Sequence, residues 1–395
     1  MTRAFIVIGS NLGDEGKGII TDYLTRLHAL KICVRFSGGA QAGHTVTVSN
    51  GPRHVFSHFG AGTFAGAITK LDEYFIVNPI LFLQEAAKLD VNGEPIVHAH
   101  PNCRVTTPWD MLINQAAERA RSERHGSCGV GINETVERCK RDEYDLRLYE
   151  IANWKLRGAI LRGRLRAIAN DWTRHRMHQL GLQPVEVQWA TDDLIDKFMT
   201  DSAVFAKRIV MSSEAPSSDA VYEGAQGLML DEDAPDFPHV TRGKTGIDNL
   251  IKTGALEGFD EIEIVYVTRP YVTRHGNGPL RREFEPSESM LDATNVTNSW
   301  QGALRYGRLD PDELAARVDK DFASTLQIRD VKSKLVRKSL AITCMDQEVP
   351  SESKVEMKNR IIKAVKPTGS VYTSSGPTAK DVQCMKSLEA IERGM

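Results

Sequence analysis

Short runs of apolar and β-branched residues recur along the chain, separated by longer polar or helix-forming stretches. The runs that stand out are AFIVIG from Ala4, ICVRF from Ile32, YFIVN from Tyr74, AVYEGAQG from Ala220, EIVYVT from Glu263 and LAITCMD from Leu340. Continuous apolar runs of this length are typical of strands that are buried on both faces of a parallel sheet. The pattern therefore predicts an α/β fold with a large, mostly parallel central sheet flanked by helices.

Between about residues 109 and 207 the strand pattern stops and helix formers predominate, which predicts a helical insertion. The basic segment KLRGAILRGRLRAIANDWTRHR within it holds one aromatic residue, Trp172, so we interpret it as a solvated helix face. We expect residues 1–395 to form one domain, because large α/β enzymes often build a single domain on one long sheet.

Composition narrows the classes of partner and the expected location. The formal net charge of the 395 residues is -2, so no positive field attracts nucleic acid or an acidic membrane. No apolar run is long enough to span a membrane and no signal-peptide pattern opens the chain, so we expect a cytoplasmic protein. The 6 scattered cysteines have neither disulfide nor zinc-ligand spacing and are expected to be reduced thiols.

The strongest chemical signal is IGSNLGDEGKG, residues 8–18, which lies between the first predicted strand and a helical run. A glycine-rich turn there offers backbone N–H groups and a helix N-terminus to an anion, and Lys17 adds a positive charge. The loop resembles those of P-loop NTPases but is not a Walker A motif, because Asn11 and Gly18 replace its glycine and hydroxyl residue. The loop also contains two carboxylates, Asp14 and Glu15, which bound phosphate would repel. Their presence therefore indicates a bound Mg²⁺ ion or a proton transfer.

A second glycine-rich segment, FSGGAQAGHTV at residues 36–46, also follows a predicted strand. Its glycines allow the backbone to approach a ligand closely. His44 follows Gly43, where its imidazole could polarise a transferring phosphoryl group or protonate a leaving oxygen.

These two segments resemble the WGDEGKGK and NAGHT patterns of the adenylosuccinate synthetase family. The resemblance continues in order along the chain, with HGSCGVGINE from His125, EGAQG from Glu223, PHVT from Pro238, YVTRHGNGP from Tyr271, QGALRYGRLD from Gln301, TCMD from Thr343 and SSGP from Ser374. In that family a nucleoside triphosphate phosphorylates O6 of a purine monophosphate, and the amine of L-aspartate then displaces the phosphate at C6. Phosphorylation turns a poor leaving group into a good one.

The resemblance implies roles for individual residues. Asp14 would be the base that takes the N1 proton and a Mg²⁺ ligand, with the Gly43 carbonyl as a second ligand; His44 and Lys17 would bind transferring phosphate. The acceptor nucleotide would be bound by Gly13, Gln41, Ser127, Cys128, Gly129, Gln226, Thr241 and His275, and by Arg138, or else Lys140 or Arg141, from the partner of a homodimer. The donor nucleotide would be bound by Gly16, Lys17, Gly18, Asp346, Ser375, Gly376 and Pro377, and aspartate by Arg305, Thr297, Asn298 and Ser299.

Several departures from the family pattern bear on the substrates. Gln41, Cys128 and His275 replace Asn, Thr and Val around the acceptor, which favours a purine with a 2-amino group, dGMP, as used by a phage branch of the family. IMP is the alternative acceptor. Cys344 replaces the lysine of the donor motif, so ATP or dATP is a candidate beside GTP. Outside ligase chemistry, the alternatives are an inactive nucleotide-binding regulator and a P-loop GTPase switch.

Overall fold

The structure is a computed structural model that describes residues 1–89, 97–122, 125–182, 191–291, 302–350 and 353–385. Within these residues a ten-stranded sheet has the order β16-β15-β14-β11-β1-β10-β2-β5-β7-β9. Its strands are β1 (Arg3–Gly9), β2 (Ile32–Arg35), β5 (Ile68–Leu71), β7 (Val97–Ala99), β9 (Ile209–Met211), β10 (Ala220–Gly227), β11 (Glu261–Thr268), β14 (Leu335–Ile342), β15 (Val371–Ser374) and β16 (Val382–Met385). Only the pair β15 and β16 is antiparallel among them. The predicted fold class is confirmed.

One of the predicted strands lies outside this sheet. The run from Tyr74 forms β6 (Ile76–Val77), which pairs with β8 (Arg104–Val105) in a separate two-stranded sheet. It is short because Asn78 accepts hydrogen bonds from the N–H groups of Ile80 and Leu81 at the start of α2 (Pro79–Leu89). A side chain that caps a helix in this way ends the extended conformation before it.

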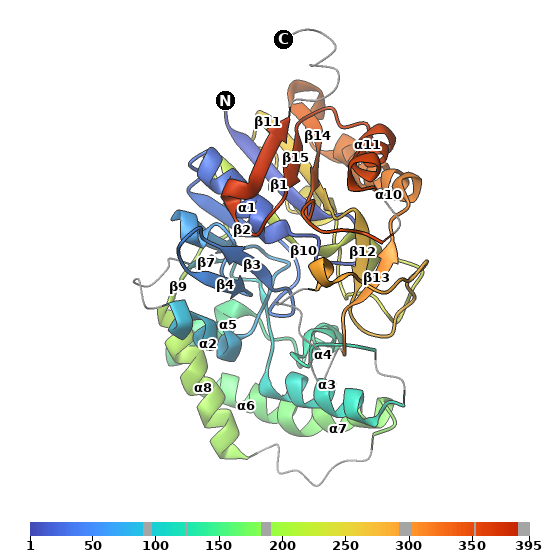
Figure 1. Cartoon of the computed structure of the whole chain (residues 1–395). Coiled ribbons are helices and arrows are strands. Elements are labelled where there is room, and N and C mark those ends of the chain that lie inside the picture. Colours follow the sequence, from blue (N-terminus) through green and yellow to red (C-terminus); the bar gives the residue numbers. More distant parts are fainter. Residues whose placement is uncertain (90–96, 123–124, 183–190, 292–301, 351–352, 386–395) are drawn as a thin grey trace.

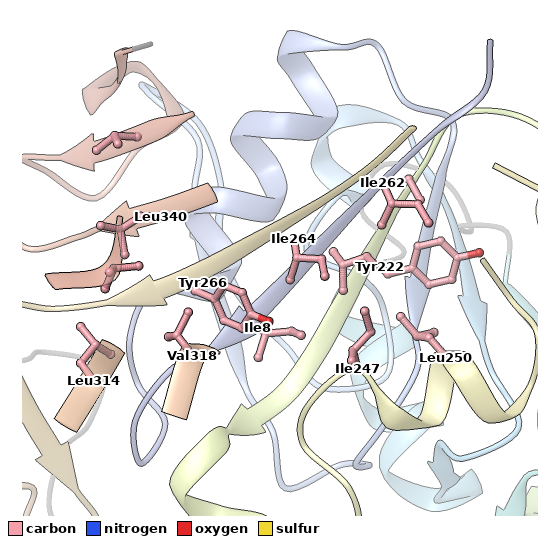
Figure 2. Packing of buried hydrophobic residues seen from close by; sticks show 14 of the residues in the cluster. Ile8, Tyr222, Ile247, Leu250, Ile262, Ile264, Tyr266, Leu314, Val318 and Leu340 are labelled. Carbon is pink, nitrogen blue, oxygen red and sulfur yellow. The ribbon is translucent and has the colours of Figure 1, made fainter. Parts of the chain in front are cut away.

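Alternate residues of β1 face opposite layers of the molecule. Phe5 and Val7 pack with the helix α1 (Lys17–Leu27) on one face of the sheet. Ile6 and Ile8 pack on the other face with α9 (Asp248–Lys252), α10 (Pro311–Ala323) and α11 (Lys354–Val365). Figure 2 shows this second layer, with strand residues such as Ile8 and Ile264 on one side and helix residues such as Leu250 and Val318 on the other. Burial on both faces explains the continuous apolar runs.

Helices predominate in the region predicted to be an insertion. They are α3 (Pro108–Ala120), α4 (Ile132–Arg138), α5 (Leu148–Ala152), α6 (Trp154–Ala167), α7 (Thr173–Gln179) and α8 (Asp192–Lys207), with a π-helical turn at Ile168–Trp172. In Figure 1 the longer of these helices gather at the end of the molecule opposite the two termini. Most of them share one core, which includes Trp109 and Trp172, with α2 and with the strands β5 and β7 of the central sheet. No helix of the described residues has the length and apolar character of a membrane span.

Two small antiparallel ribbons complete the fold. β3 (His44–Thr47) pairs with β4 (Arg53–Phe56), and β12 (Tyr271–Arg274) pairs with β13 (Arg305–Arg308). The first ribbon packs on α1. Both ribbons follow the carboxyl ends of sheet strands, and this edge of an open α/β sheet is where ligands bind.

Candidate active site

The loop after β1 emerges at the carboxyl edge of the sheet, between β10 and β11. Gly13, Asp14 and Gly16 have φ angles of 96°, 59° and 89°, and α1 begins directly afterwards at Lys17. Glycine adopts this left-handed conformation freely, whereas aspartate does so at a modest cost. A side chain at Gly9 would lie 2.6 Å from the Glu15 carboxylate, so glycine is required there for steric reasons.

Glu15 stabilises this loop through contacts inside it. Its carboxylate accepts hydrogen bonds from the backbone N–H groups of Asn11 (2.8 Å) and Gly13 (3.0 Å) and contacts Lys17 Nζ at 3.1 Å. Burial would raise the pKa of Glu15, but Lys17 and the two N–H groups outweigh burial and lower the pKa. Glu15 therefore has a structural role, and those two N–H groups are already used. Both carboxylates of the loop line the neighbouring pocket, but the Asp14 side chain is partly exposed whereas that of Glu15 is buried in the loop.

His44 is the first residue of β3 and contacts a buried carboxylate. Its Nδ1 lies 2.6 Å from Glu223 Oε1, and its Nε2 lies 3.3 Å from the carbonyl oxygen of Ala225. Burial lowers the pKa of His44, with Arg35 and Lys17 acting in the same direction, whereas Glu223 acts against them. Burial would raise the pKa of Glu223, but His44 and Arg35 hold it at about 2. The Glu223 carboxylate is therefore ionised at neutral pH.

These loops enclose a pocket of about 970 Å³. The predicted residues that line it are Gly13, Asp14, Gly16, Lys17, Gly18, Gln41, Gly43, His44, Ser127, Cys128, Gln226, Thr241 and His275. Gly129 is not among the lining residues; its carbonyl accepts a hydrogen bond from Gln115. Segments from five separate parts of the chain thus meet at the carboxyl edge of the sheet.

Residues that depart from the family pattern lie together in this pocket. His275 Nε2 is 3.4 Å from Asp14 Oδ2, and both side chains are partly exposed. A side chain at Gly126 would lie 2.4 Å from the Gly276 Cα, so the loops that carry Cys128 and His275 touch through these two glycines. Burial raises the pKa of Cys128 to about 11, which keeps its thiol neutral.

The structure corrects the assignment of Arg138. Its guanidinium is fully buried and donates to both carboxylate oxygens of Asp110 and to the carbonyl oxygens of Val105 and Tyr144. An arginine held in this way cannot reach a partner subunit. Arg141 lies close to His175 and the Trp172 ring, whereas Lys140 is exposed and lines the pocket.

Several cations of the pocket were not predicted. Arg121, Arg176, Arg242, Arg269 and Arg274 all line it. Arg269 directly follows β11, and Arg274 is the last residue of β12. Because ligands bind beyond the carboxyl ends of strands in such folds, both positions could have been recognised from the sequence. Arg121 and Arg176 could not be found, because their places depend on how the helical region packs against the sheet, whereas Arg242 directly follows the predicted Thr241.

Of the predicted donor residues, Gly16, Lys17 and Gly18 line the pocket, whereas Asp346 and residues 375–377 lie beyond its lining but along the same edge of the sheet. Thr343 Oγ1 donates to the Glu15 carbonyl (2.6 Å), and Met345 N donates to the Ser374 carbonyl (2.8 Å). This links the loop after β14, which carries Asp346, to the phosphate loop. Ser375, Gly376 and Pro377 follow β15 directly.

The residues predicted to bind aspartate are placed only in part. The guanidinium of Arg305 contacts the Glu283 carboxylate through two nitrogens and donates to the carbonyls of Gly276 and Gly278. It thus lies behind the loop that carries His275. Thr297, Asn298 and Ser299 lie outside the described residues.

The oxygen atoms of the pocket suit a magnesium ion. Among the described residues no group of three or more His, Cys, Asp or Glu side chains is arranged to hold a metal. Mg²⁺ does not need such a cage, because it is usually held by one or two carboxylates together with substrate phosphates and water. The Asp14 carboxylate and the Gly43 carbonyl, both on the pocket wall, fit that pattern.

The sheet and the pocket define an α/β protein with a large pocket at the carboxyl edge of its strands. The profile of one family, adenylosuccinate synthetase, matches residues 6–311. The chain belongs to the adenylosuccinate synthetase family.

Curated relatives carry the same family name. The adenylosuccinate synthetase of Synechococcus sp. (strain RCC307) is 29% identical over 291 residues, which cover 72% of this chain and 64% of that protein. The adenylosuccinate synthetase of Methylococcus capsulatus is 31% identical over 322 residues, which cover 77% of this chain and 68% of that protein. The chain therefore spans somewhat less than two thirds of the length of the Synechococcus relative.

Two solved structures share the fold. Fully ligated adenylosuccinate synthetase from Plasmodium falciparum has a TM-score of 0.69 and 17% identity, covering 97% of this chain and 99% of that chain. The succinoaminodeoxyadenylate synthetase of cyanophage S-2L, solved with dGMP and with dATP as an energy donor, has a TM-score of 0.63 and 16% identity. This structural match covers 100% of the present chain and 98% of the cyanophage protein.

Proposed function

We propose that the protein is a ligase that joins L-aspartate to C6 of a 6-oxopurine monophosphate. The γ-phosphoryl group of a nucleoside triphosphate is transferred to O6, which leaves a nucleoside diphosphate. The aspartate amine then forms the bond to C6 while the C6–O6 bond breaks and phosphate departs. The observation that carries this proposal is the convergence of Asp14, Lys17 and His44 on one pocket at the carboxyl edge of the sheet.

Each of these side chains has a task that its place suits. Asp14 takes the N1 proton, because its carboxylate faces the pocket whereas that of Glu15 is held inside the loop. Lys17, at the first position of α1, binds phosphate oxygens together with the helix N-terminus. His44 stabilises charge on the transferring phosphoryl group. Mg²⁺ held by Asp14 and the Gly43 carbonyl would neutralise phosphate charge.

The favoured acceptor is dGMP, which would give 2-amino-2'-deoxy-N6-succinyladenylate. N1 of a purine is adjacent to C2, so a group beside Asp14 is placed to meet a 2-amino substituent. His275 is such a group, 3.4 Å from Asp14, and it replaces the valine of the family pattern. The phage synthetase of the same fold that was solved with dGMP supports this choice. IMP is the alternative acceptor.

One experiment tests the reaction and its alternatives together. The protein is incubated with aspartate, Mg²⁺ and ATP, dATP or GTP in turn, and with IMP, GMP or dGMP, and succinylated products are identified by mass. Phosphate release without aspartate would indicate a GTPase switch, and nucleotide binding without turnover an inactive regulator. The same series identifies the donor, for which the loss of lysine at Cys344 leaves ATP and dATP open beside GTP.

In direct competition, dGMP is expected to exceed IMP in catalytic efficiency by at least about tenfold, which corresponds to about 1.4 kcal/mol. The physical reason is that omission of the 2-amino group leaves a buried acceptor without a partner, at a cost of about 1–3 kcal/mol. His275→Val should remove most of this preference. Turnover of IMP by the same variant is the internal control. Consumption of IMP before dGMP would show that the acceptor assignment is wrong.

Arg305 is proposed to bind a carboxylate of aspartate. It already holds Glu283 in a two-pronged contact, and an aspartate carboxylate can take the place of Glu283. Arg305→Lys should raise the KM for aspartate by about tenfold or more while the KM values for both nucleotides change little, because lysine cannot make the paired contact. An unchanged KM for aspartate would exclude Arg305 from this role.

A homodimer is proposed from the family resemblance. With Arg138 buried, Lys140 is the remaining exposed cation of the predicted set on the pocket wall. Sedimentation of the protein with and without nucleotide measures the oligomeric state.

A further inference from the structure

Glu223 is a buried carboxylate that the proposed reaction does not yet use. It lies on β10, is fully shielded from solvent and is the register partner of Arg35 on β2. One oxygen, Oε2, accepts a hydrogen bond from Ala61 N (3.1 Å) and lies 3.7 Å from Arg35 Nε. The other oxygen, Oε1, lies 2.6 Å from Nδ1 of His44. The shortest contact of this carboxylate is thus with a residue of the pocket wall.

This contact bears on where a proton of His44 resides. An ionised carboxylate can only accept hydrogen bonds, so a carboxylate oxygen 2.6 Å from Nδ1 favours the form of the ring that has a proton on Nδ1. The ring is also fixed on its other side, because Nε2 lies 3.3 Å from the Ala225 carbonyl, two residues further along β10. The same strand therefore sets both the orientation and the hydrogen-bonding pattern of the imidazole.

Arg35 keeps the carboxylate charged although it is buried. Its guanidinium has no exposed surface and also donates to the carbonyls of Phe59 (3.2 Å) and Ala42 (3.1 Å). Ala42 is two residues before His44, so Arg35 ties the His44 segment to the same network. If the Arg35–Glu223 pair served only to stabilise the core, Glu223 would not need its shortest contact with His44 at the pocket wall.

We propose that Glu223 is a positioning residue for phosphoryl transfer. It holds the His44 ring in place through the 2.6 Å contact with Nδ1 and favours a proton on that nitrogen, so that the ring lies at the pocket wall in one fixed orientation. Carboxylates that orient a catalytic or metal-bound histidine act in the same way in other proteins. The inference rests on the proposed function, because His44 acts on phosphate only if that reaction occurs.

Glu223→Gln is the variant that tests the inference. The amide has almost the same volume, and its oxygen can still accept from Ala61 N–H, but its NH₂ group can only donate to Nδ1. Nδ1 then has no acceptor for a proton, so the ring is no longer held in the same form and orientation. We expect kcat to fall by about 10–100-fold, the range for the loss of such orienting partners, with little change in either nucleotide KM.

The matched control is Glu85→Gln. Glu85 is also a buried carboxylate held by histidines, His54 (3.5 Å) and His58 (3.4 Å), and it does not line the pocket. Its neutralisation should lower stability as Glu223→Gln does, but it should leave kcat unchanged. Thermal unfolding of both variants measures the shared structural cost.

Nuclear magnetic resonance of histidine-labelled protein gives a readout that does not depend on activity. The wild type should show a downfield Nδ1 proton for His44, which is assigned by its loss in His44→Asn and is absent in Glu223→Gln. Absence of this proton from the wild type, or a kcat loss no greater than that of Glu85→Gln, would overturn the inference. If Glu223→Gln does not fold, the wild-type resonance and Glu223→Asp, with an expected smaller kcat loss, decide the question. If the wild type forms no succinylated purine, the proposed function fails, whereas the resonance still tests the contact.

Discussion

Asp14→Asn is expected to lower turnover by about 10²–10⁴-fold, the usual cost of losing a general base. The amide keeps the volume of the side chain but can neither take the N1 proton nor supply a negative charge to Mg²⁺. The fold should survive, because Asp14 has a φ of 59° and asparagine is among the residues that best tolerate this conformation. The measurement is kcat with saturating aspartate, donor and acceptor, together with the thermal unfolding midpoint.

Asp330→Asn is the matched control for this variant. Asp330 has a φ of 54°, is exposed, and lies in the turn after α10, away from the pocket lining. The same chemical change in the same backbone conformation should leave kcat unchanged. Near-normal turnover by Asp14→Asn, at a stability equal to that of the wild type, would remove Asp14 from the mechanism.

The features that sequence predicted well are those carried by continuous segments. The phosphate loop, with Asp14 and Lys17, and the segment ending in His44 each follow a strand, so their chemistry and their place at the sheet edge could be inferred together. The buried runs predicted five of the ten strands of the central sheet, β1, β2, β10, β11 and β14, for the same reason. The strand β5, with sequence ITKL, escaped prediction because Thr69 and Lys70 interrupt its apolar pattern.

The features that sequence missed depend on pairs that are distant along the chain. Glu223 could be recognised as part of a motif, but its contact with His44 arises only because the first residue of β3 lies against β10 in the folded chain. Arg138 was assigned to a partner subunit because nothing in the local sequence indicates that Asp110, 28 residues earlier, neutralises it inside the same chain. In both cases the burial of a charge decided the role, and burial is a property of the packed fold.

The second large effect concerns stability and follows from the burial of Arg138. Arg138→Ala is expected to lower the free energy of unfolding by about 3–5 kcal/mol, the range for breaking a buried ion pair from one side. The change leaves the Asp110 carboxylate, which also caps α3 through Thr107, without its cation. It also leaves the carbonyl groups of Val105 and Tyr144 without the guanidinium, which donates to each of them at 2.6 Å. Urea unfolding followed by circular dichroism measures the loss.

Arg141→Ala separates this interpretation from a role at a subunit interface. Arg141 is exposed, and its contacts with His175 and the Trp172 ring are those of a surface side chain, so its removal should cost about 0–1 kcal/mol. If Arg138 instead reached across a dimer to the acceptor phosphate, Arg138→Ala would keep its stability and raise the acceptor KM. A destabilised Arg138 variant beside a stable Arg141 variant would place the Arg138 charge inside the helical region, where it holds α4 against α3 and thereby shapes one wall of the pocket.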